Sequence, residues 1–282
     1  MSRRHLVSPR RMQTLAFVGL WTAAAVVILP VFGIISYMMY RGFSALSLDM
    51  FRVGTEGLLP AIVGSVCLVV LTTLIAAPLG VAAAVYLNEY ARQGPLVHLV
   101  RLALVNLAGV PSVVYGLFGL ALFVVLFQFG RCLLAGACTL ALLVLPLVIS
   151  TSEESLRQVP HHLRQASWAL GATRWQTVRR VVLPNAFPGI ITALILSVGR
   201  AAGETAPILF TAAFYSLSHP FPRSLFDEIL VLPYQLFVMA TEAPNVTIEQ
   251  KWATAFVLVV LVLGLNLAAI VTRARLRSRH RW

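Results

Sequence analysis

Five long stretches without a charged residue constrain the fold of this chain more than any other feature of its sequence. They occupy residues 12–40, 57–88, 102–130, 132–152 and 252–272, and a sixth apolar stretch, 185–222, is interrupted only by Arg200 and Glu204. A helix needs about 20 predominantly apolar residues to cross a hydrocarbon core about 30 Å thick. The sequence therefore predicts an all-α integral membrane protein with six spanning helices, centred near residues 26, 73, 115, 142, 200 and 262.

The composition excludes a water-soluble globular domain. Hydrophobic residues make up 59% of the 282 residues and charged residues only 11%, whereas soluble domains carry about 25% charged residues. The net charge of +12 does not indicate a nucleic-acid partner, because the arginines lie at the ends of the apolar stretches, where they set membrane topology. Cys67, Cys132 and Cys138 lie in or beside apolar stretches without metal-ligand spacing, so we expect packing roles and no metal site.

Basic residues also orient the six spans. One side of the membrane receives sixteen arginines, and the other side receives four arginines and Lys251. The sixteen are Arg3, Arg4, Arg10, Arg11, Arg92, Arg101, Arg157, Arg164, Arg174, Arg179, Arg180, Arg273, Arg275, Arg277, Arg279 and Arg281. Because basic residues favour the cytoplasmic side, we expect both termini and the polar 153–184 loop in the cytoplasm.

The chain divides into three parts. Residues 1–56 hold the N-terminus, the first span and an outer loop; residues 57–272 hold the other five spans; residues 273–282 form a basic tail. The first apolar stretch exceeds the roughly 7–15 residues of a signal-peptide core, so we expect an uncleaved span. A short break at Arg131 predicts a tight hairpin between spans three and four. Residues 223–251 predict a short re-entrant or interfacial piece on the outer face.

Several catalytic and energy-coupling motifs are missing from the sequence. A P-loop requires a lysine, and the only one, Lys251, lies between Gln250 and Trp252. The sequence also lacks HExxH and Gly-x-Ser-x-Gly. Proton- or sodium-driven carriers usually have several acidic residues within their spans. Glu204 is the only one here, so the sequence does not favour an ion-driven carrier. We therefore expect a non-catalytic chain that binds no cofactor and, if it transports, takes its energy from a partner.

The 153–184 loop contains more patterned structure than a simple turn requires. Pro160 can open a helix, and Leu163, Ala166 and Leu170 fall on one face of it. Gly171 allows the left-handed backbone that ends a helix, and helical spacing resumes from Arg174.

We expect Pro184 to start the next element, so that residues 160–184 form a bent, rigid knob. Its apolar stripe requires a partner surface that buries it, and its arginines suit an acidic rim around that surface. The alternative is an amphipathic hairpin lying on anionic lipid.

Arg200 and Glu204 place two charges inside the fifth span. A central arginine costs about 2.5–3.5 kcal/mol on insertion scales, and Glu204 lies one turn further on. One interpretation is a structural ion pair. The other is that Arg200 faces a polar pathway and attracts an oxyanion with its planar fork, while Glu204 holds its orientation.

The third span carries Asn106, Ser112 and Tyr115 among small residues and prolines. These polar groups are expected either to hydrogen-bond between helices or to line an anion path. The glycines and prolines at 109, 111, 116 and 119 permit close helix contacts or a broken helix at a cargo site.

The knob resembles the "EAA" loop of ABC-importer permeases. The run Gln165-Ala166-Ser167 is followed by Gly171, and Val181 precedes Leu183-Pro184 at the family's spacing. Gln165 stands for the family's Glu and Ser167 for its second Ala. The resemblance implies a coupling helix that inserts into a separate ATPase subunit. The coupling residues would then be Leu163, Gln165, Ala166, Ser167, Leu170, Gly171, Arg174, Leu183 and Pro184.

A second set of motifs is similar to phosphate importer permeases of the Pst type, and more to the A-type than to the C-type subunit. Arg200-Ala201-Ala202-Gly203-Glu204-Thr205-Ala206-Pro207 matches the family signature, and Asn106 to Ser112 followed by Tyr115 to Gly119 matches another. The resemblance implies a type I ABC-importer permease fold over residues 57–272 in a bacterial inner membrane. Its implied pathway residues are Arg200, Glu204, Thr205, Asn106 and Ser112.

The same resemblance implies the partners. These are a second, PstC-like permease, a PstB-like ATPase dimer that carries ATP and Mg, and a PstS-like phosphate-binding protein outside the membrane. Two alternatives remain open. The chain could serve another solute, such as sulfate, molybdate or peptide, or it could be a stand-alone anion channel or carrier.

Overall fold

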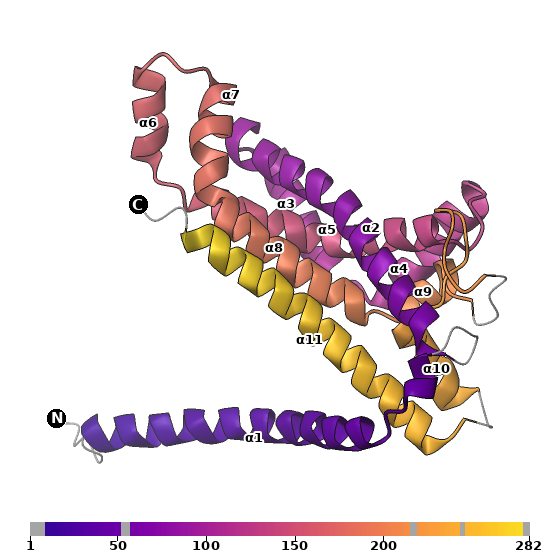
Figure 1. The fold of residues 1–282 in the computed structure, drawn as a ribbon. Coiled ribbons are helices and arrows are strands. Elements are labelled where there is room, and N and C mark those ends of the chain that lie inside the picture. Colours follow the sequence, from indigo (N-terminus) through magenta and orange to yellow (C-terminus); the bar gives the residue numbers. More distant parts are fainter. Residues whose placement is uncertain (1–8, 52–56, 215–218, 243–245, 279–282) are drawn as a thin grey trace.

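The computed structural model describes residues 9–51, 57–214, 219–242 and 246–278, and within these ranges every regular element is a helix (Figure 1). The arginines at 3, 4, 279 and 281 lie outside the described residues. One isolated bridge joins Ala213 to Ile229. The all-helical fold predicted from the sequence is confirmed.

Five continuous helical segments of the described chain are long and apolar enough to cross a membrane. Helix α1 spans Pro9–Ser44, and α2 (Leu58–Val85) continues into a π-helical turn, η2 (Tyr86–Tyr90). Helix α5 spans Leu133–Arg157 and α11 spans Ile248–Ser278. The fifth segment joins α7 (Arg174–Thr177), the π-helical η4 (Val178–Val182) and α8 (Leu183–Gly203) without a break.

The third predicted span is a broken helix, which is one of the two arrangements that its glycines and proline permit. It consists of α3 (Pro95–Ala108) and α4 (Ser112–Gly119), which continues into the π-helical η3 (Leu120–Leu126), and the two halves are bent by 102°. Pro111 caps α4 in an extended conformation, since proline has no N–H for a continuous helix and disfavours the α region for Val110. The expected hairpin turn before α5 is present, with positive φ at Gln128 and Gly130, but its first arm is the bent one.

The core lies between α2, α5 and α8, with α9 (Ala206–Thr211) and α4 packed on one end of it. Small residues permit the close approach of these helices. A Cβ at Gly80 would lie 2.6 Å from Val148, and one at Gly119 would lie 2.1 Å from Thr139. Such contacts hold membrane helices together, because burial against lipid supplies little hydrophobic driving force.

The described residues 219–242 after α9 fold back and form no spanning helix, and their predicted place on the outer face stays a prediction. Carbonyls of Leu225 and Asp227 accept from the N–H groups of Leu134 and Leu133, which satisfies the start of α5. Helix α10 (Leu232–Thr241) then packs on α2 and α11. The hydroxyl of Ser65 on α2 accepts from the Leu232 N–H at 2.9 Å and fixes where α10 begins.

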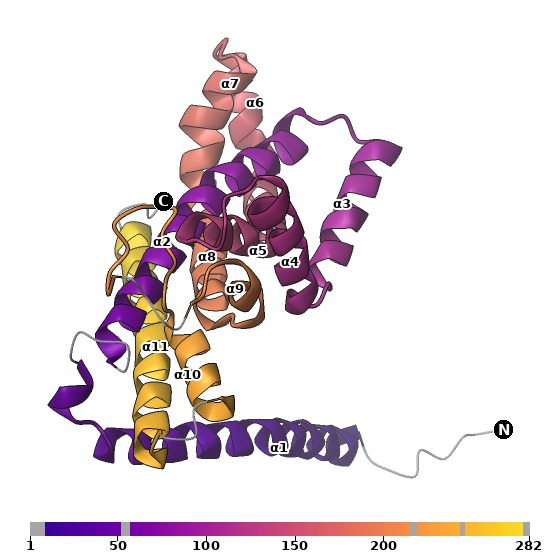
Figure 2. The same ribbon diagram turned by 90° about the vertical axis from the view of Figure 1, so that its right-hand side faces the viewer.

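Helix α1 lies apart from the other spans over most of its length (Figures 1 and 2). Its C-terminal end crosses α11, where Tyr37 meets Trp252 and Phe43 meets Phe256 edge to face. Gly42 allows this crossing, because a Cβ there would lie 2.3 Å from Phe256. A short 3₁₀ turn, η1 (Leu48–Phe51), follows.

Candidate functional site

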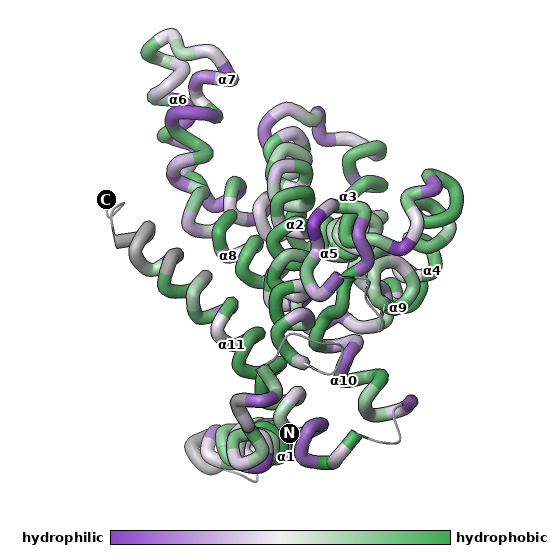
Figure 3. The backbone as a smooth tube through the Cα atoms, turned by 45° about the vertical axis from the view of Figure 1, so that its right-hand side comes forward, coloured by the Kyte–Doolittle hydropathy of each residue, from purple (hydrophilic) through white to green (hydrophobic). Residues whose placement is uncertain are grey.

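The knob (residues 160–184) projects from one end of the helical bundle, and its residues are on average more hydrophilic than those of the bundle (Figures 1 and 3). Helix α6 (His161–Ala169) and helix α7 run side by side, joined by a turn. Gly171 in this turn has φ of +79°, so the predicted left-handed glycine is confirmed. Nothing lies within 4 Å of a Cβ built at Gly171, so the glycine is required by its backbone conformation and not by crowding.

Polar contacts close the turn of the knob. Thr173 and Gln176 form a capping box: the Thr173 hydroxyl accepts from the Gln176 N–H, and the Gln176 side chain accepts from the Thr173 N–H at 2.8 Å. The hydroxyls of Ser167 and Thr177 lie 2.9 Å apart and join α6 to α7. These bonds fix the angle between the two helices without any contribution from a partner.

A buried ion pair fastens the knob to the membrane domain. Arg164, with a side chain 5% exposed, lies 2.7 Å from a carboxylate oxygen of Glu89 in η2, which is 8% exposed. The same guanidinium donates to the carbonyls of Leu156, at 2.9 Å, and Val159 at the C-terminal end of α5. A cation there also interacts favourably with the helix dipole. Arg164 therefore joins the ends of α2 and α5 to α6.

The prediction that the knob arginines point outward to an acidic rim is therefore wrong for Arg164. Arg174 is exposed, but its guanidinium lies over the Tyr90 ring at 5.1 Å from the centroid. Arg179 and Arg180 are exposed. A second buried carboxylate, Glu153, pairs with Arg101 at 2.7 Å.

The remaining coupling candidates lie on two different surfaces. Leu163 and Leu183 are half-buried and pack on the core, whereas Gln165, Ala166 and Pro184 are exposed. Leu170 is 88% exposed, with Trp168 and Trp175 also exposed near it in sequence. The predicted stripe of Leu163, Ala166 and Leu170 is therefore divided: its base is packed and its tip is bare.

Pro184 lies in the first turn of α8, which begins at Leu183, so the predicted start of an element there agrees to within one residue. It also lies in one uninterrupted helix, Arg174–Gly203, that leads from the knob into the membrane. The π-helical turn η4 comes immediately before it, and a π turn is one way in which a helix accommodates an irregular hydrogen-bond pattern. The Asn185 amide also donates to the Val181 carbonyl at 2.7 Å.

The far end of this helix carries the Arg200 site, formed by Arg200, Glu204 and Thr205. Helix α8 ends at Gly203, and Glu204 is extended, with φ −74° and ψ 135°, before α9 begins. Arg200 Nε lies 3.6 Å from Glu204 Oε1, and the two side chains are 33% and 17% exposed. The ion pair exists, but it is neither tight nor buried, so the guanidinium keeps most of its donors for another group.

Two broken helices meet beside this site. Helix α4 packs on α9 so closely that a Cβ at Gly116 would lie 2.9 Å from Pro207 Cα. Tyr115 shares a buried cluster with Ala201 and Ile208, and its hydroxyl donates to the Leu107 carbonyl at 2.9 Å. Tyr115 therefore bridges the bend between α3 and α4.

In the described chain, no hydrogen bond or ion pair joins the two other pathway candidates to Arg200. Ser112 is half-buried at the start of α4, and Asn106 is exposed on α3. Neither side chain hydrogen-bonds to another described residue, so the predicted interhelical bonds of Asn106 and Ser112 are absent there. Both remain on surfaces of the isolated chain.

Sequence reasoning missed the buried pair Glu89–Arg164 and the pair of buried Glu153 with half-buried Arg101. One signal was available: by the predicted topology, the cytoplasmic side holds only three acidic residues, Glu89, Glu153 and Glu154, against sixteen arginines. Because arginines outnumber the carboxylates on this side, each carboxylate is expected to pair with an arginine. The sequence does not say which arginine each one takes, since Glu89 and Arg164 are 75 residues apart.

The comparison with protein families settles the class of the chain. Residues 76–282 match the family described as the binding-protein-dependent transport system inner membrane component. The chain belongs to this family. It is therefore a multi-pass membrane permease subunit. Its apolar segments are the candidate spans of this transport component, six if the bent pair counts as one span.

Similar permeases include named phosphate transport proteins. The permease is 36% identical over 258 residues to the phosphate transport system permease protein PstA of Mycobacterium leprae, covering 88% of this chain and 84% of the relative. It is 32% identical to PstA 1 of Mycobacterium tuberculosis, covering 99% and 93%.

Solved structures show that the permease has an ABC-importer permease fold. The MetNI methionine ABC transporter in an inward-facing conformation matches with a TM-score of 0.61 and 20% identity, over 82% of this chain and 99% of that chain. A bacterial importer of the acidic polysaccharide alginate matches with a TM-score of 0.67 and 15% identity, over 94% and 96%.

Proposed function

We propose that this permease forms half of the membrane pathway of an ATP-driven importer of inorganic phosphate. The knob would dock on a separate ATPase in the cytoplasm, and the Arg200 site would face the phosphate pathway. Both termini would lie in the cytoplasm of a bacterial inner membrane. The partners would be lipid, a second PstC-like permease, a PstB-like ATPase dimer carrying ATP and Mg, and a PstS-like phosphate-binding protein outside.

One observation carries the coupling part of this proposal. The helix Arg174–Gly203 runs uninterrupted from the knob to the Arg200 site. At about 1.5 Å per residue, its 30 residues span about 45 Å. A push on the knob therefore has a direct mechanical route to the helix break at Glu204, and no catalytic residue of this chain is needed.

Three features support an anion as cargo. The Pst-type relatives are named for phosphate transport. Arg200 is a third exposed and only loosely paired with Glu204. A guanidinium with free donors suits a tetrahedral oxyanion, because its fork donates two parallel hydrogen bonds.

The docking part is tested by charging the tip of the knob. Leu170→Asp puts a carboxylate on a side chain that is 88% exposed, so the chain should still fold. We expect the ATPase to co-purify at least about tenfold less well, as expected for a buried interface anchor. The matched control, Leu225→Asp, charges an exposed leucine of the outer loop and should leave co-purification unchanged. Equal co-purification of both variants would argue against docking through the knob.

The cargo is tested separately, with proteoliposomes of the assembled complex given phosphate, sulfate, molybdate or peptide. Phosphate uptake that requires ATP supports the proposal, whereas uptake of another solute alone would assign a different cargo. Transport by the purified chain without an ATPase would instead make it a stand-alone channel or carrier.

A further inference from the structure

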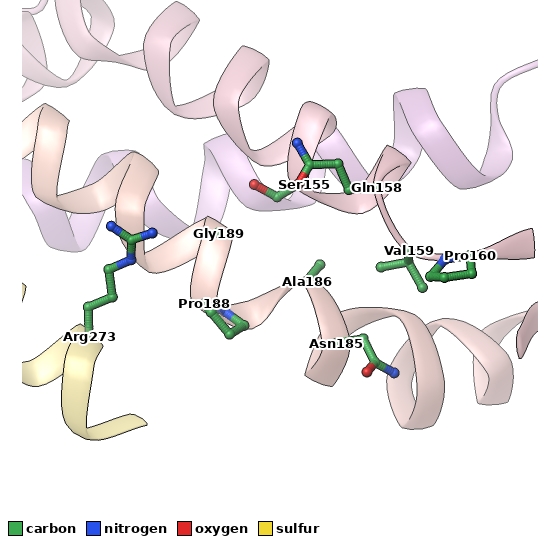
Figure 4. Close-up of a pocket in the computed structure, with 9 residues that line it drawn as sticks. All are labelled: Ser155, Gln158, Val159, Pro160, Asn185, Ala186, Pro188, Gly189 and Arg273. Carbon is green, nitrogen blue, oxygen red and sulfur yellow. The ribbon is translucent and has the colours of Figure 1, made fainter. Parts of the chain in front are cut away.

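A pocket at the base of the knob is unexplained by docking or by the Arg200 site. It has a volume of about 380 Å³, which lies in the range of small-ligand sites. Three elements line it: the end of α5 with the following Val159-Pro160 hinge, the start of α8, and the end of α11 (Figure 4). Its polar lining side chains are Ser155, Gln158, Asn185 and Arg273.

The lining carries positive charge and donors but no carboxylate. Arg273 is half-buried, extends from α11 toward α8 (Figure 4), and forms no ion pair with an acidic residue of the described chain. The Asn185 amide uses one N–H on the Val181 carbonyl and keeps the other. The Gln158 amide has only a long contact, 3.5 Å, to the exposed Glu154, which does not line the pocket. Such a set of groups favours an anion.

The pocket also lies where a phosphate group is available. Arg273 comes directly after the uncharged stretch 252–272 of α11. Arg275 and Arg277 continue the basic run in sequence. Basic pockets between spanning helices at this level bind phosphate-bearing head groups. We infer that this pocket binds a phosphate group, either the phosphodiester of an anionic phospholipid or free inorganic phosphate.

A bound phosphate group would contact three elements at once. These are the Val159-Pro160 connection before α6, the start of α8, which leads to Arg200, and the last turns of α11. Binding would therefore hold the knob at one angle to the membrane domain. This site differs from the Arg200 site, which lies at the opposite end of α8.

The test uses the full-length chain in phosphatidylcholine nanodiscs, without ATP or partners. One arm adds phosphatidylglycerol and counts retained lipid by native mass spectrometry. The other arm titrates radiolabelled inorganic phosphate. Arg273→Ala should weaken binding in one arm by about tenfold, as expected for loss of a charge-assisted fork. Arg180→Ala removes the same charge from an exposed arginine of η4 that does not line the pocket, and it should bind like wild type.

The two arms identify the source of the phosphate group. Loss of phosphatidylglycerol alone indicates a lipid site, and loss of inorganic phosphate alone indicates a solute site. Phosphate that stays bound in Arg273→Ala belongs elsewhere, including the Arg200 site, so the outcome is independent of the transport proposal.

If Arg273→Ala fails to fold, Gln158→Leu gives a second reading, because Gln158 is exposed and its loss leaves the core intact. Binding equal to wild type in both arms, for whichever of these variants folds, would overturn the inference.

Discussion

The knob and the Arg200 site lie at opposite ends of one helix, and their charges are held in different ways. At the knob, Arg164 and Glu89 are both buried and 2.7 Å apart. At the other end, Arg200 and Glu204 are 3.6 Å apart and partly exposed. The knob is complete within this chain except for its bare tip, whereas the Arg200 site keeps free donors. This contrast is expected of a rigid lever that acts on an adaptable pathway.

The largest effect should come from breaking the buried pair. Glu89→Gln leaves the Arg164 charge buried without a counter-charge, and we expect a loss of about 3–5 kcal/mol in stability. Thermal unfolding and proteolysis of the 160–184 region measure it. The double variant Glu89→Leu with Arg164→Met should be less damaged than Glu89→Gln, because no unpaired charge remains buried.

The matched control for this effect is Asp227→Asn in the loop after α9. Asp227 is half-buried, and backbone N–H groups of Arg223 and Ser224 hold its pKa below the usual 3.8. Because the folded pKa is the lower one, its contribution is present above pH 3.8 and is lost as the pH falls through the folded pKa. At neutral pH, Asp227→Asn should shift the unfolding temperature far less than Glu89→Gln. Equal shifts would contradict the difference between the two carboxylates.

Substitutions of Arg200 should change phosphate transport and leave the stability of the chain nearly unchanged. In the assembled complex, Arg200→Ala should lower phosphate uptake at least about tenfold, because a charge-assisted fork is lost, while the unfolding temperature changes little. Arg200→Lys should recover only part of the uptake, since an ammonium cannot donate as a planar fork. Normal uptake by Arg200→Ala would remove Arg200 from the pathway.

A smaller effect is expected at the turn of the knob. Gly171→Ala forces a Cβ onto a residue with φ of +79° and should cost about 1–2 kcal/mol locally. Amide hydrogen exchange over residues 161–177 should report this loss. Gly171→Asn should be milder, because asparagine tolerates the left-handed region. Gly94→Ala, at an extended loop glycine with φ of −174°, serves as the control and should change exchange little.

The sequence predicted the positions of the apolar segments well, because a bilayer imposes length and hydropathy on each of them. It also predicted the left-handed Gly171, since the backbone at that position has few other solutions. The sequence left open whether the third span breaks at Gly109–Pro111, because uninterrupted hydropathy describes a bent pair and a straight span equally well. Pro184 lies in the first turn of α8 as predicted, but the pattern did not show that the π-helical turn η4 joins α7 to α8 without a break.

The candidate site also has a part that local sequence predicts and a part that depends on tertiary packing. Motif residues such as Arg200 and Gly171 are visible from local pattern, although their roles stay predictions. The partners of Arg164 depend on how α2, α5 and α6 come together. Which arginine is buried and which exposed is therefore a property of tertiary packing, and local spacing does not contain it.

The account depends on the helix Arg174–Gly203 moving as one rod. Spin labels at Trp175 and Leu196, which are 56% and 50% exposed, can be introduced after Cys67, Cys132 and Cys138 are replaced. Their separation along a rigid helix is about 32 Å. Pulsed electron paramagnetic resonance on the assembled complex should give the same distance with and without ATP. A distance that changes between the two states would contradict transmission through this helix.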